Sequence, residues 1–392
     1  MEVKKLKECC TIIAGQSPES KYYNSNGEGL PFFQGKADFG ELYPSIRVYC
    51  SQPTKIAEKD DILLSVRAPV GPTNLAPCKV CIGRGLTAIR PSEVLLTRYV
   101  LLFFRYFEAQ LASKGTGTTF KAITQDVVKN LEIPIPPLPE QERIVARIEE
   151  LFSQLDAGVE TLKKTKAQLA VYRQAVLTEA FNSAEVDCKM LPIAEILTKT
   201  RKGMSTGPFG TMIKKSDHKA TGVPMLGIEN IGRGQFVDGN KIYVTAEKAE
   251  ELKAFSLKAG DIIISRSGTV GEICAVPERA EGSLLSTNLM RVSLDNTMIR
   301  SDYFIALFQS KGIVLDQIKE LCKGSTRDFL NQTILKQIVF PVPSMEKQEE
   351  IVSIIEARMS VCDSIEQTVD TALQQAEAMR QSILKDAFEG RL

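Results

Sequence analysis

Apolar residues recur at alternating steps of three and four along two stretches of the chain, the spacing of a heptad seam on a long helix. The first seam contains Ile144, Ile148, Leu151, Leu155, Gly158, Leu162, Thr165, Leu169, Tyr172 and Val176. The second contains Ile351, Ile355, Cys362, Ile365, Val369, Ala372, Ala376, Met379 and Ile383, with Arg358 as a misfit. Small residues such as Gly158 would face larger ones in the other helix, so we expect the two helices to pair with each other.

The two helical stretches are copies of one another. The sequence "PIPPLPEQERIVARIEELF" at Pro134 returns as "PVPSMEKQEEIVSIIEARM" at Pro341, and a shift of 207 positions aligns residues 134–181 with 341–388 without a gap. The repeat includes Asp156/Asp363, Arg173/Arg380 and the pairs Gln141/Gln348 and Phe181/Phe388. Each proline cluster is predicted to end a strand and set the helix start, because proline cannot continue a ladder or a helix interior.

The segments before each helix are also related, and they show a different pattern. Short β-branched runs between Gly, Pro, Asn and Asp, such as "GDIIISRSG", predict a small, irregular mixed sheet with a helix or two. "DILLSVRAPVG" at Asp61 matches "DIIISRSGTVG" at Asp261, "KGTGTTF" at Lys114 matches "KGSTRDF" at Lys323, and "GLPFFQ" at Gly29 resembles "GVPMLG" at Gly222. The chain is therefore predicted to be a tandem of two units, each a mixed module followed by a long helix.

The predicted fold class is α+β, with two mixed modules joined by two long helices. Antiparallel pairing of the helices would give the tandem a pseudo-twofold axis, whereas two separate surface helices, each packed on its own module, remain the alternative. The predicted segments are module 1 (1–133), the first helix region (134–184), module 2 (185–340) and the second helix region (341–392).

Charge separates the modules from the helices. The whole chain is nearly neutral at +1, but residues 1–133 carry 17 basic and 13 acidic side chains, and residues 185–340 carry 21 and 18. Residues 134–181 carry 6 basic and 7 acidic side chains, and residues 341–392 carry 5 basic and 10 acidic side chains. The mildly basic modules are compatible with phosphate binding, since nucleic-acid affinity comes from local Lys and Arg clusters, although an ordinary solvated surface explains the counts equally well.

The sequence predicts neither a membrane span nor a secretion signal. Its most apolar run, "YVLLFFRYF" at Tyr99, is far shorter than a membrane helix and is interrupted by Arg105, and the charged start "MEVKKLKECC" has no apolar signal core. We therefore expect a cytoplasmic protein whose nine cysteines are reduced and mostly buried.

No motif in the sequence predicts catalysis. The single histidine, His218, lies in a polar loop, and "CKVC" at Cys78 is half of a zinc site without a second pair in range. The glycine-rich stretches "GTGTTFK" and "GMSTGPFGT" do not complete a phosphate loop, and Glu19 with Lys21 forms only a lone ExK pattern. We predict that the chain is not an enzyme and binds neither a metal nor a cofactor itself.

Two variable modules joined by two related helices, each opened by a "PxPPLxEQ" element, resemble the specificity subunit of type I restriction-modification systems. The carriers are "IPIPPLPEQERIVARIEEL" with "YRQAVLTEAF" and "FPVPSMEKQEEIVSIIEAR" with "MRQSILKDAFEGRL", although Ser344, Glu346 and Lys347 depart from the pattern. The resemblance implies that the modules are target recognition domains and that the helices form an antiparallel coiled-coil spacer. The chain would then bind a bipartite, asymmetric site in double-stranded DNA.

The resemblance also implies partners. These are two modification subunits, which carry the methyltransferase chemistry and use S-adenosylmethionine, and motor-nuclease restriction subunits, which use ATP with Mg. Two other functions are weighed against this one: a coiled-coil scaffold that binds only proteins, and the recognition half of a methyltransferase-nuclease, which the missing catalytic motifs oppose.

Polar side chains on the module loops are the predicted DNA contacts, with Arg and Lys suited to guanine or phosphate and Asn and Gln to adenine. In module 1 they are Lys21, Tyr22, Asn24, Gln34, Lys36, Arg67, Arg84, Lys114 and Thr118. In module 2 they are Lys202, Lys214, Lys215, Asn230, Arg233, Gln235, Arg266, Asn288, Lys323 and Arg327. Arg67 with Arg266 and Lys114 with Lys323 are favoured, because they lie in matching loops.

Overall fold

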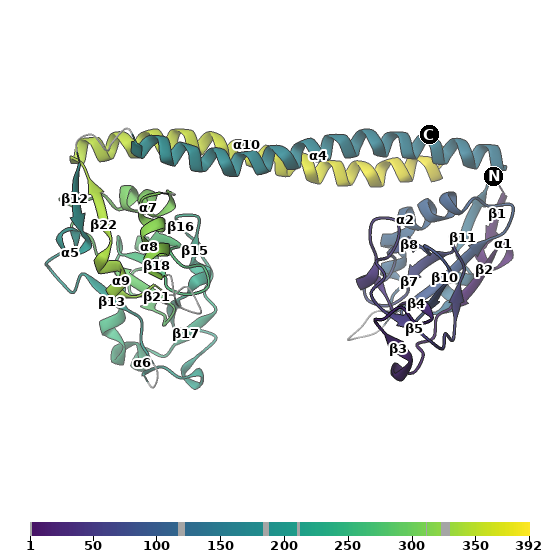
Figure 1. Cartoon of the computed structure of the whole chain (residues 1–392), viewed down its shortest axis with the longest axis horizontal. Coiled ribbons are helices and arrows are strands. Elements are labelled where there is room, and N and C mark those ends of the chain that lie inside the picture. The colour runs from purple at the N-terminus through teal and green to yellow at the C-terminus, as the bar shows by residue number, and fades with distance from the viewer. Residues whose placement is uncertain (1, 117–121, 183–187, 210–211, 311, 323–329) are drawn as a thin grey trace. The chain divides into compact units, whose positions relative to one another are not determined.

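The computed structural model describes residues 2–116, 122–182, 188–209, 212–310, 312–322 and 330–392 (Figure 1). The chain forms two compact units, unit 1 with Met1–Lys163 and Asp370–Leu392, and unit 2 with Lys164–Val369. Both long helices, α4 (Leu138–Asn182) and α10 (Met345–Phe388), pass from one unit into the other. Each unit therefore contains one module together with the beginning of one long helix and the end of the other.

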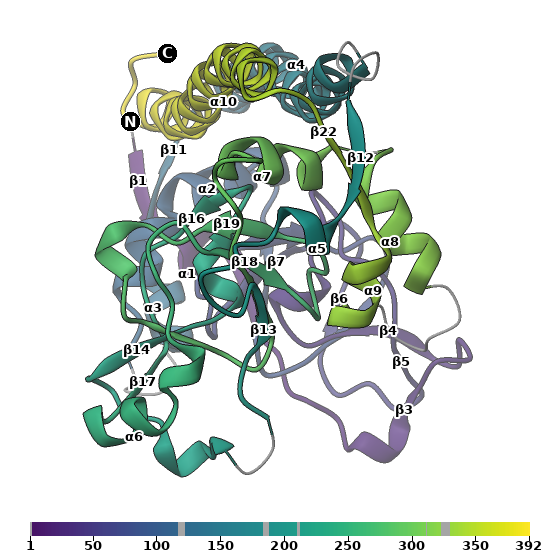
Figure 2. The same ribbon diagram turned by 90° about the vertical axis from the view of Figure 1, so that its left-hand side faces the viewer.

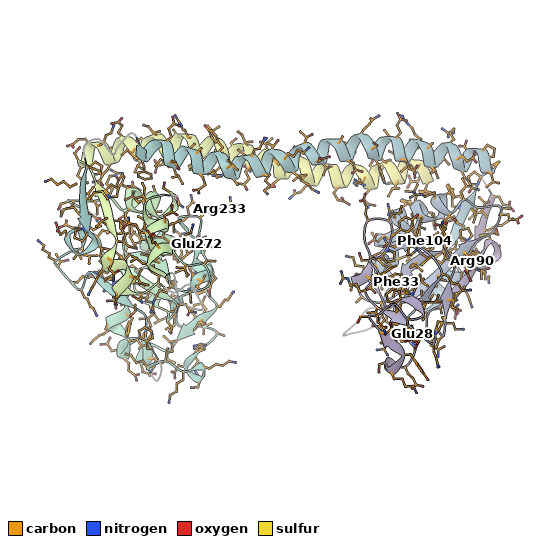
Figure 3. The ribbon with its side chains drawn as sticks, viewed as in Figure 1. Glu28, Phe33, Arg90, Phe104, Arg233 and Glu272 are labelled. Atoms are coloured by element: carbon orange, nitrogen blue, oxygen red, sulfur yellow. The ribbon has the colours of Figure 1, made fainter. Side chains whose placement is uncertain are left out.

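Unit 1 is built around an antiparallel four-stranded sheet in the order β2-β10-β7-β8. The strands are β2 (Cys10–Ala14), β7 (Ile62–Ser65), β8 (Thr73–Leu75) and β10 (Leu86–Pro91). Helix α2 (Thr97–Ser113) shares one apolar core with this sheet and with both long helices, because its buried aromatic run contacts all of them (Figure 1). Phe104 of α2 and Phe33 of β4 (Leu30–Phe33), both labelled in Figure 3, are fully buried.

The second sheet of unit 1 has the order β3-β5-β4-β9-β6, and its strands β4 and β9 are parallel. Its strands are β3 (Tyr23–Asn24), β4 (Leu30–Phe33), β5 (Tyr49–Cys50), β6 (Ile56–Ala57) and β9 (Val80–Ile82). The remaining elements are β1 (Glu2–Lys5), α1 (Leu6–Cys9), α3 (Gln125–Lys129) and β11 (Glu132–Ile135).

Unit 2 repeats this order of elements. Its antiparallel sheet β13-β21-β18-β19 corresponds to β2-β10-β7-β8, and its parallel pair β14–β20 corresponds to β4–β9. The strands are β12 (Lys189–Pro192), β13 (Met204–Thr206), β14 (Val223–Leu226), β15 (Ile231–Gly232), β16 (Gln235–Phe236), β17 (Ile242–Val244), β18 (Ile262–Ser265), β19 (Ile273–Ala275), β20 (Leu284–Leu285), β21 (Leu289–Val292) and β22 (Val339–Val342). The helices are α5 (Ile193–Ile196), α6 (Ala246–Glu251), α7 (Ser301–Gln309), α8 (Val314–Cys322) and α9 (Gln332–Gln337). The predicted mixed modules and their tandem repeat are thus confirmed.

A two-stranded antiparallel sheet connects each module to a long helix. Strand β1 pairs with β11 in unit 1, and β12 pairs with β22 in unit 2, where the two strands lie side by side (Figure 2). Pro134 and Pro341 lie inside these strands opposite Val3 and Met190, and each strand ends one residue later, directly before Pro136 or Pro343, so each proline cluster ends its strand as predicted. Proline is accommodated there because each strand of a two-stranded sheet has one open edge.

An equivalent glutamine side chain holds the module on the start of a long helix in each unit. Gln141 is fully buried, accepts a hydrogen bond from the Leu96 amide at 2.9 Å and donates to two carbonyls. Gln348 is equally buried and accepts from the Arg300 amide at 2.9 Å. Its amide donates to the carbonyls of Met298 and Pro343 at 2.9 and 3.0 Å. The repeated glutamine therefore joins the segment before the module helix to the proline junction at the start of the long helix in each unit.

Gln348→Ala is expected to cost about 3 kcal/mol of stability, because it leaves one buried amide and two buried carbonyls without this partner. Hydrogen exchange of the segment around Arg300 should accelerate, since its amide loses the glutamine acceptor. The matched control is Gln337→Ala at the exposed end of α9, which should leave both measurements within about 0.5 kcal/mol of the parent. Equal effects of the two substitutions would contradict this role.

The two long helices run antiparallel within each unit. In unit 2, Arg173 of α4 pairs with Asp363 of α10 at 2.7 Å, and Arg358 of α10 pairs with Glu179 of α4. In unit 1, Asp156 of α4 pairs with Arg380 of α10. The partner numbers rise on one helix as they fall on the other, which excludes two separate surface helices.

Nine of the nineteen predicted seam residues are buried and six are half-buried, whereas Gly158, Tyr172, Ile365 and Met379 are exposed. Tyr172, Ile365 and Met379 are 49%, 40% and 53% exposed. Leu177 and Leu384 are buried instead, in the cores that contain α7 and α2. Where a long helix packs against a module as well as against the other helix, its buried residues no longer follow the heptad spacing.

Two further predictions from composition can be compared with the structure. Among the described cysteines, eight are free thiols, and Cys9, Cys50, Cys81, Cys274 and Cys362 are buried. Burial raises the pKa of Cys274 to about 12, which keeps that thiol protonated. No helix in the described part of the chain is both long and apolar enough to cross a membrane.

Candidate nucleic-acid interface

In unit 1, three backbone segments meet at one end of the four-stranded sheet. They are the residues after β2, the loop after β7 and the turn between β9 and β10. Hydrogen bonds from the Gly15 amide to the Leu86 carbonyl and from the Val66 amide to the Gly85 carbonyl, both 2.9 Å, bring them together. We call this the loop corner of unit 1 and define it by Gln16, Ser17, Arg67 and Arg84.

Local sequence makes this corner rigid. The buried Ser65 hydroxyl donates to the Arg67 carbonyl at 3.1 Å and to the Pro69 carbonyl at 2.8 Å, which folds the loop back on β7. The Ser17 hydroxyl accepts a hydrogen bond from the Arg84 amide at 3.2 Å. Arg67 and Arg84 are exposed, so the corner presents two guanidinium groups on a fixed backbone. Guanidinium groups suit guanine edges and phosphates.

Unit 2 builds the same corner with different side chains. The Gly207 amide donates to the Leu289 carbonyl at 3.2 Å, as Gly15 does in unit 1, and the Ser265 hydroxyl donates to the Ser267 carbonyl at 3.1 Å, as Ser65 does to Arg67. The loop corner of unit 2 consists of Pro208, Phe209, Ser267 and Thr287, the structural equivalents of Gln16, Ser17, Arg67 and Arg84, together with Asn288, the equivalent of Gly85.

The structure corrects the prediction for Arg266. The hydrogen bonds of the loop make Ser267 the equivalent of Arg67 and Val66 the equivalent of Arg266. Arg266 is only 4% exposed, and it donates to the carbonyls of Leu330 at 3.2 Å and Thr287 at 3.1 Å. Burial lowers the pKa of its guanidinium. Arg266 thus supports the corner from inside and does not lie on a DNA-facing surface.

The prediction of a DNA contact by Asn230 is also wrong, because this side chain is buried as well. Its side chain is fully buried, where its oxygen accepts from the Gly227 amide at 2.9 Å and its NH₂ group donates to the carbonyls of Val237 and Gly239. Since these bonds use both ends of the amide to hold a turn, Asn230 organises the backbone of unit 2 and cannot read a base edge.

The other predicted residues of module 1 are on or near the surface. Lys21 pairs with Glu19 at 2.6 Å and lies over the Tyr22 ring, while Asn24 bonds to the Glu28 backbone at both ends of its amide. Gln34 and Lys36 are exposed, and so is Lys114, which lies over the Phe107 ring. Thr118 lies outside the described residues.

In module 2, Lys202, Lys214, Lys215, Gln235 and Asn288 are exposed, and Lys323 and Arg327 lie outside the described residues. Arg233 is exposed, yet its guanidinium pairs with Glu366 of α10 at 3.1 Å (Figure 3). Glu366 also pairs with Arg173 at 2.9 Å, so within unit 2 Arg233 links a module loop to the helix pair. DNA contact by the exposed residues stays a prediction.

The sequence reasoning missed the corner residues Gln16, Ser17, Phe209, Ser267 and Thr287. Phe209 lies in "GMSTGPFGT", which was considered only as a phosphate loop. An aromatic residue between Gly-Pro and Gly in a polar loop was an available signal. The equivalence of Ser17 and Phe209 follows only from the strand pairing.

Within the described ranges, no group of three His, Cys, Asp or Glu side chains comes close enough together to hold a metal ion. Cys81 lies in β9 and is buried, and Cys78 precedes that strand and is half-buried. This places the CxxC pair at the edge of a sheet core.

Comparisons with known proteins connect this architecture to one family. The family model described as "Type I restriction modification DNA specificity domain" matches residues 1–170 and 195–375. The chain is similar to the putative type I restriction enzyme MjaX specificity subunit of Methanocaldococcus jannaschii, with 41% identity over 42% of this chain and 38% of the relative. It is also similar to the EcoKI specificity subunit of Escherichia coli K12, with 25% identity over 81% of this chain and 70% of the relative.

The fold is shared along the whole chain with a solved structure. A chain from work on complex assembly and conformational transition of the type I R-M system matches with a TM-score of 0.74, covering 100% of this chain and 98% of that one at 19% identity. The MjaX match spans well under half of the relative's length, whereas this structural match includes both modules and both helices.

Proposed function

Because the chain belongs to the type I restriction-modification DNA specificity family, we propose that it recognises a bipartite, asymmetric site in double-stranded DNA, each unit reading one half. The prediction that it is a DNA specificity subunit, and therefore not itself an enzyme, agrees with the family match. The two long helices would set the gap between the half-sites.

One observation carries the proposal of two different half-sites. The loop corners of the two units have the same backbone scaffold, yet unit 1 presents Arg67 and Arg84, and unit 2 presents Asn288 beside Phe209. Arginine suits guanine and phosphate, whereas asparagine suits adenine. Equivalent scaffolds with different surface chemistry are what two readers of unlike half-sites require.

The partners follow from the family. We propose assembly with two modification subunits, which use S-adenosylmethionine, and with restriction subunits, which use ATP with Mg, in the cytoplasm. The chain itself would supply no cofactor and no catalytic group. Support comes from the family match, which covers both modules and most of both long helices.

Exchange of one module tests this function. Residues 189–342 should be replaced as a block by the corresponding segment of a relative, because β12 and β22 pair with each other and must come from one parent. With its modification subunits, the chimera is expected to methylate a motif in which one half-site is new and the other half and the gap are unchanged.

The reciprocal exchange of residues 2–135 is the matched control, and it should change only the other half-site. Methylated-motif sequencing of DNA from cells that express each complex provides the measurement. Simultaneous change of both half-sites by one exchange would contradict independent reading, and a protein-only scaffold would produce no motif at all.

A further inference from the structure

We propose that Phe209 is a specificity-determining residue, which reads the half-site of unit 2 through apolar contact with a base rather than through a hydrogen bond. The inference rests on the proposed function, since it concerns how the same loop corner recognises DNA. The first observation is exposure: the Phe209 side chain, three residues after the end of β13 (Met204–Thr206), is 50% exposed.

A buried arginine lies behind the ring. The guanidinium carbon of Arg266 is 5.2 Å from the centre of the Phe209 ring, while Arg266 itself is 4% exposed. The guanidinium is held by the carbonyls of Leu330 and Thr287. Because a positive charge over a ring face is attractive, this contact holds Phe209 in place and opposes its collapse into the module.

The backbone beside the ring is also fixed. The Thr287 hydroxyl donates to the Pro208 carbonyl at 2.8 Å, and the Met212 amide donates to the Phe209 carbonyl at 3.1 Å. At Gly207, a Cβ atom would lie 1.9 Å from the Ser286 carbonyl oxygen, so only glycine permits this close approach of loop and turn. The ring is thus presented on a pre-organised loop, which lowers the entropy cost of a contact.

In unit 1, a polar residue occupies the position that is equivalent to Phe209. Ser17 is the equivalent of Phe209, and its hydroxyl is used inside the corner by the Arg84 amide. The outward groups of that corner are the arginines. An isolated exposed apolar residue is common and needs no explanation. Here, however, the apolar residue replaces a polar one at the corner that distinguishes the units, and a buried arginine supports it.

Apolar side chains recognise DNA in two ways that share this chemistry. They contact the C5-methyl group of thymine in the major groove, or they wedge against the faces of a base step in the minor groove. Both contacts discriminate between sequences without a hydrogen bond. Asn288 is exposed in the same corner; its side-chain oxygen accepts a hydrogen bond from the Ser267 hydroxyl at 3.4 Å, and its NH₂ group would donate to a neighbouring base pair.

The test compares Phe209→Ala with Val237→Ala in the full complex with its modification subunits. Val237 is a similarly exposed apolar residue of the same module, 43% exposed, but it lies outside the corner. Phe209→Ala is expected to relax the preference at one position of the unit 2 half-site by about tenfold, leaving the other half-site and the gap unchanged. Val237→Ala should leave the whole methylated motif unchanged, and Phe209→Leu, which keeps an apolar group and checks the fold, should lie between the two.

Duplex binding separates the two contacts. If uracil in place of thymine weakens DNA binding by the wild-type complex but not by the Phe209→Ala complex, Phe209 contacts the thymine methyl group. If uracil has no effect on binding while Phe209→Ala still loses discrimination, Phe209 contacts the faces of a base step. Either result supports the proposal. An unchanged motif in Phe209→Ala, or a loss of affinity that is equal for all sequences, overturns it. Failure of the proposed function is distinguishable, because the wild-type complex would then yield no bipartite motif.

Discussion

Removing one heptad from each long helix is expected to shorten the gap between the two recognised half-sites without changing their bases. The deletions are residues 162–168 of α4 and 369–375 of α10, which occupy equivalent positions under the 207-residue shift. Seven residues at 1.5 Å each shorten a helix by about 10 Å, which equals about three base pairs of DNA at 3.4 Å each. The gap should therefore lose two or three base pairs.

The deleted segments lie between the ion pairs that align the helices. Asp156 with Arg380 and Arg173 with Asp363 remain, so pairing within each unit should survive. Because three base pairs also rotate one half-site by roughly a third of a turn, binding must be measured on duplexes with randomised gaps. The control deletes the heptad from α4 alone, which breaks the match between the helices and should abolish specific binding. An unchanged gap in the double deletion would refute the spacer role.

Arg173→Glu is expected to destabilise the helix pair of unit 2 by about 2 kcal/mol, between the values for exposed and for buried ion pairs, because Asp363 is 63% exposed. Arg173 is 18% exposed and lies within 2.7 and 2.9 Å of Asp363 and Glu366, and Glu366 is 20% exposed. The substitution would place three carboxylates together and would also release Glu366 from one of its cations. Urea unfolding and hydrogen exchange along α4 would detect the loss.

Arg147→Glu is the matched control, because Arg147 forms an exposed ion pair with Glu150 of the same helix, at 2.7 Å. Its effect should stay within about 1 kcal/mol, as is usual for exposed pairs. Adding Asp363→Arg to Arg173→Glu should restore part of the lost stability by reversing the pair. If the double variant is no more stable than the single one, the pair does not align the helices.

The sequence was sufficient for the architecture wherever a periodic pattern is repeated. The heptads predicted both helices, and the 207-residue shift predicted equivalent junctions, because burial along a helix follows the spacing of apolar residues. The repeat also linked "DILLSVRAPVG" to "DIIISRSGTVG", which the structure places in equivalent strands and loops. The proline clusters also end the strands as predicted, since β11 and β22 stop directly before Pro136 and Pro343; Pro134 and Pro341 remain within the strands because an open sheet edge tolerates a missing amide donor.

The candidate interface was only partly predictable, because surface exposure is a tertiary property. Arg67 and Arg266 lie in matching loops, but the aligned segments set them one residue apart, and the structure places Arg67 on the surface and Arg266 inside. One position along a β-strand or its exit loop reverses the direction of a side chain. Asn230 was misjudged for a similar reason, since a polar residue in a turn serves the backbone as readily as it serves a ligand.

By itself, the sequence determined that the chain is a tandem of two modules with two long helices, and which residues correspond under the repeat. It showed that Asp156 and Asp363, and Arg173 and Arg380, are copies. Only the tertiary structure decided that Asp156 pairs with Arg380 and that Arg173 pairs with Asp363, in different units. A local pattern records which face of a helix is apolar, whereas the choice of partner depends on how segments far apart in the chain are packed together.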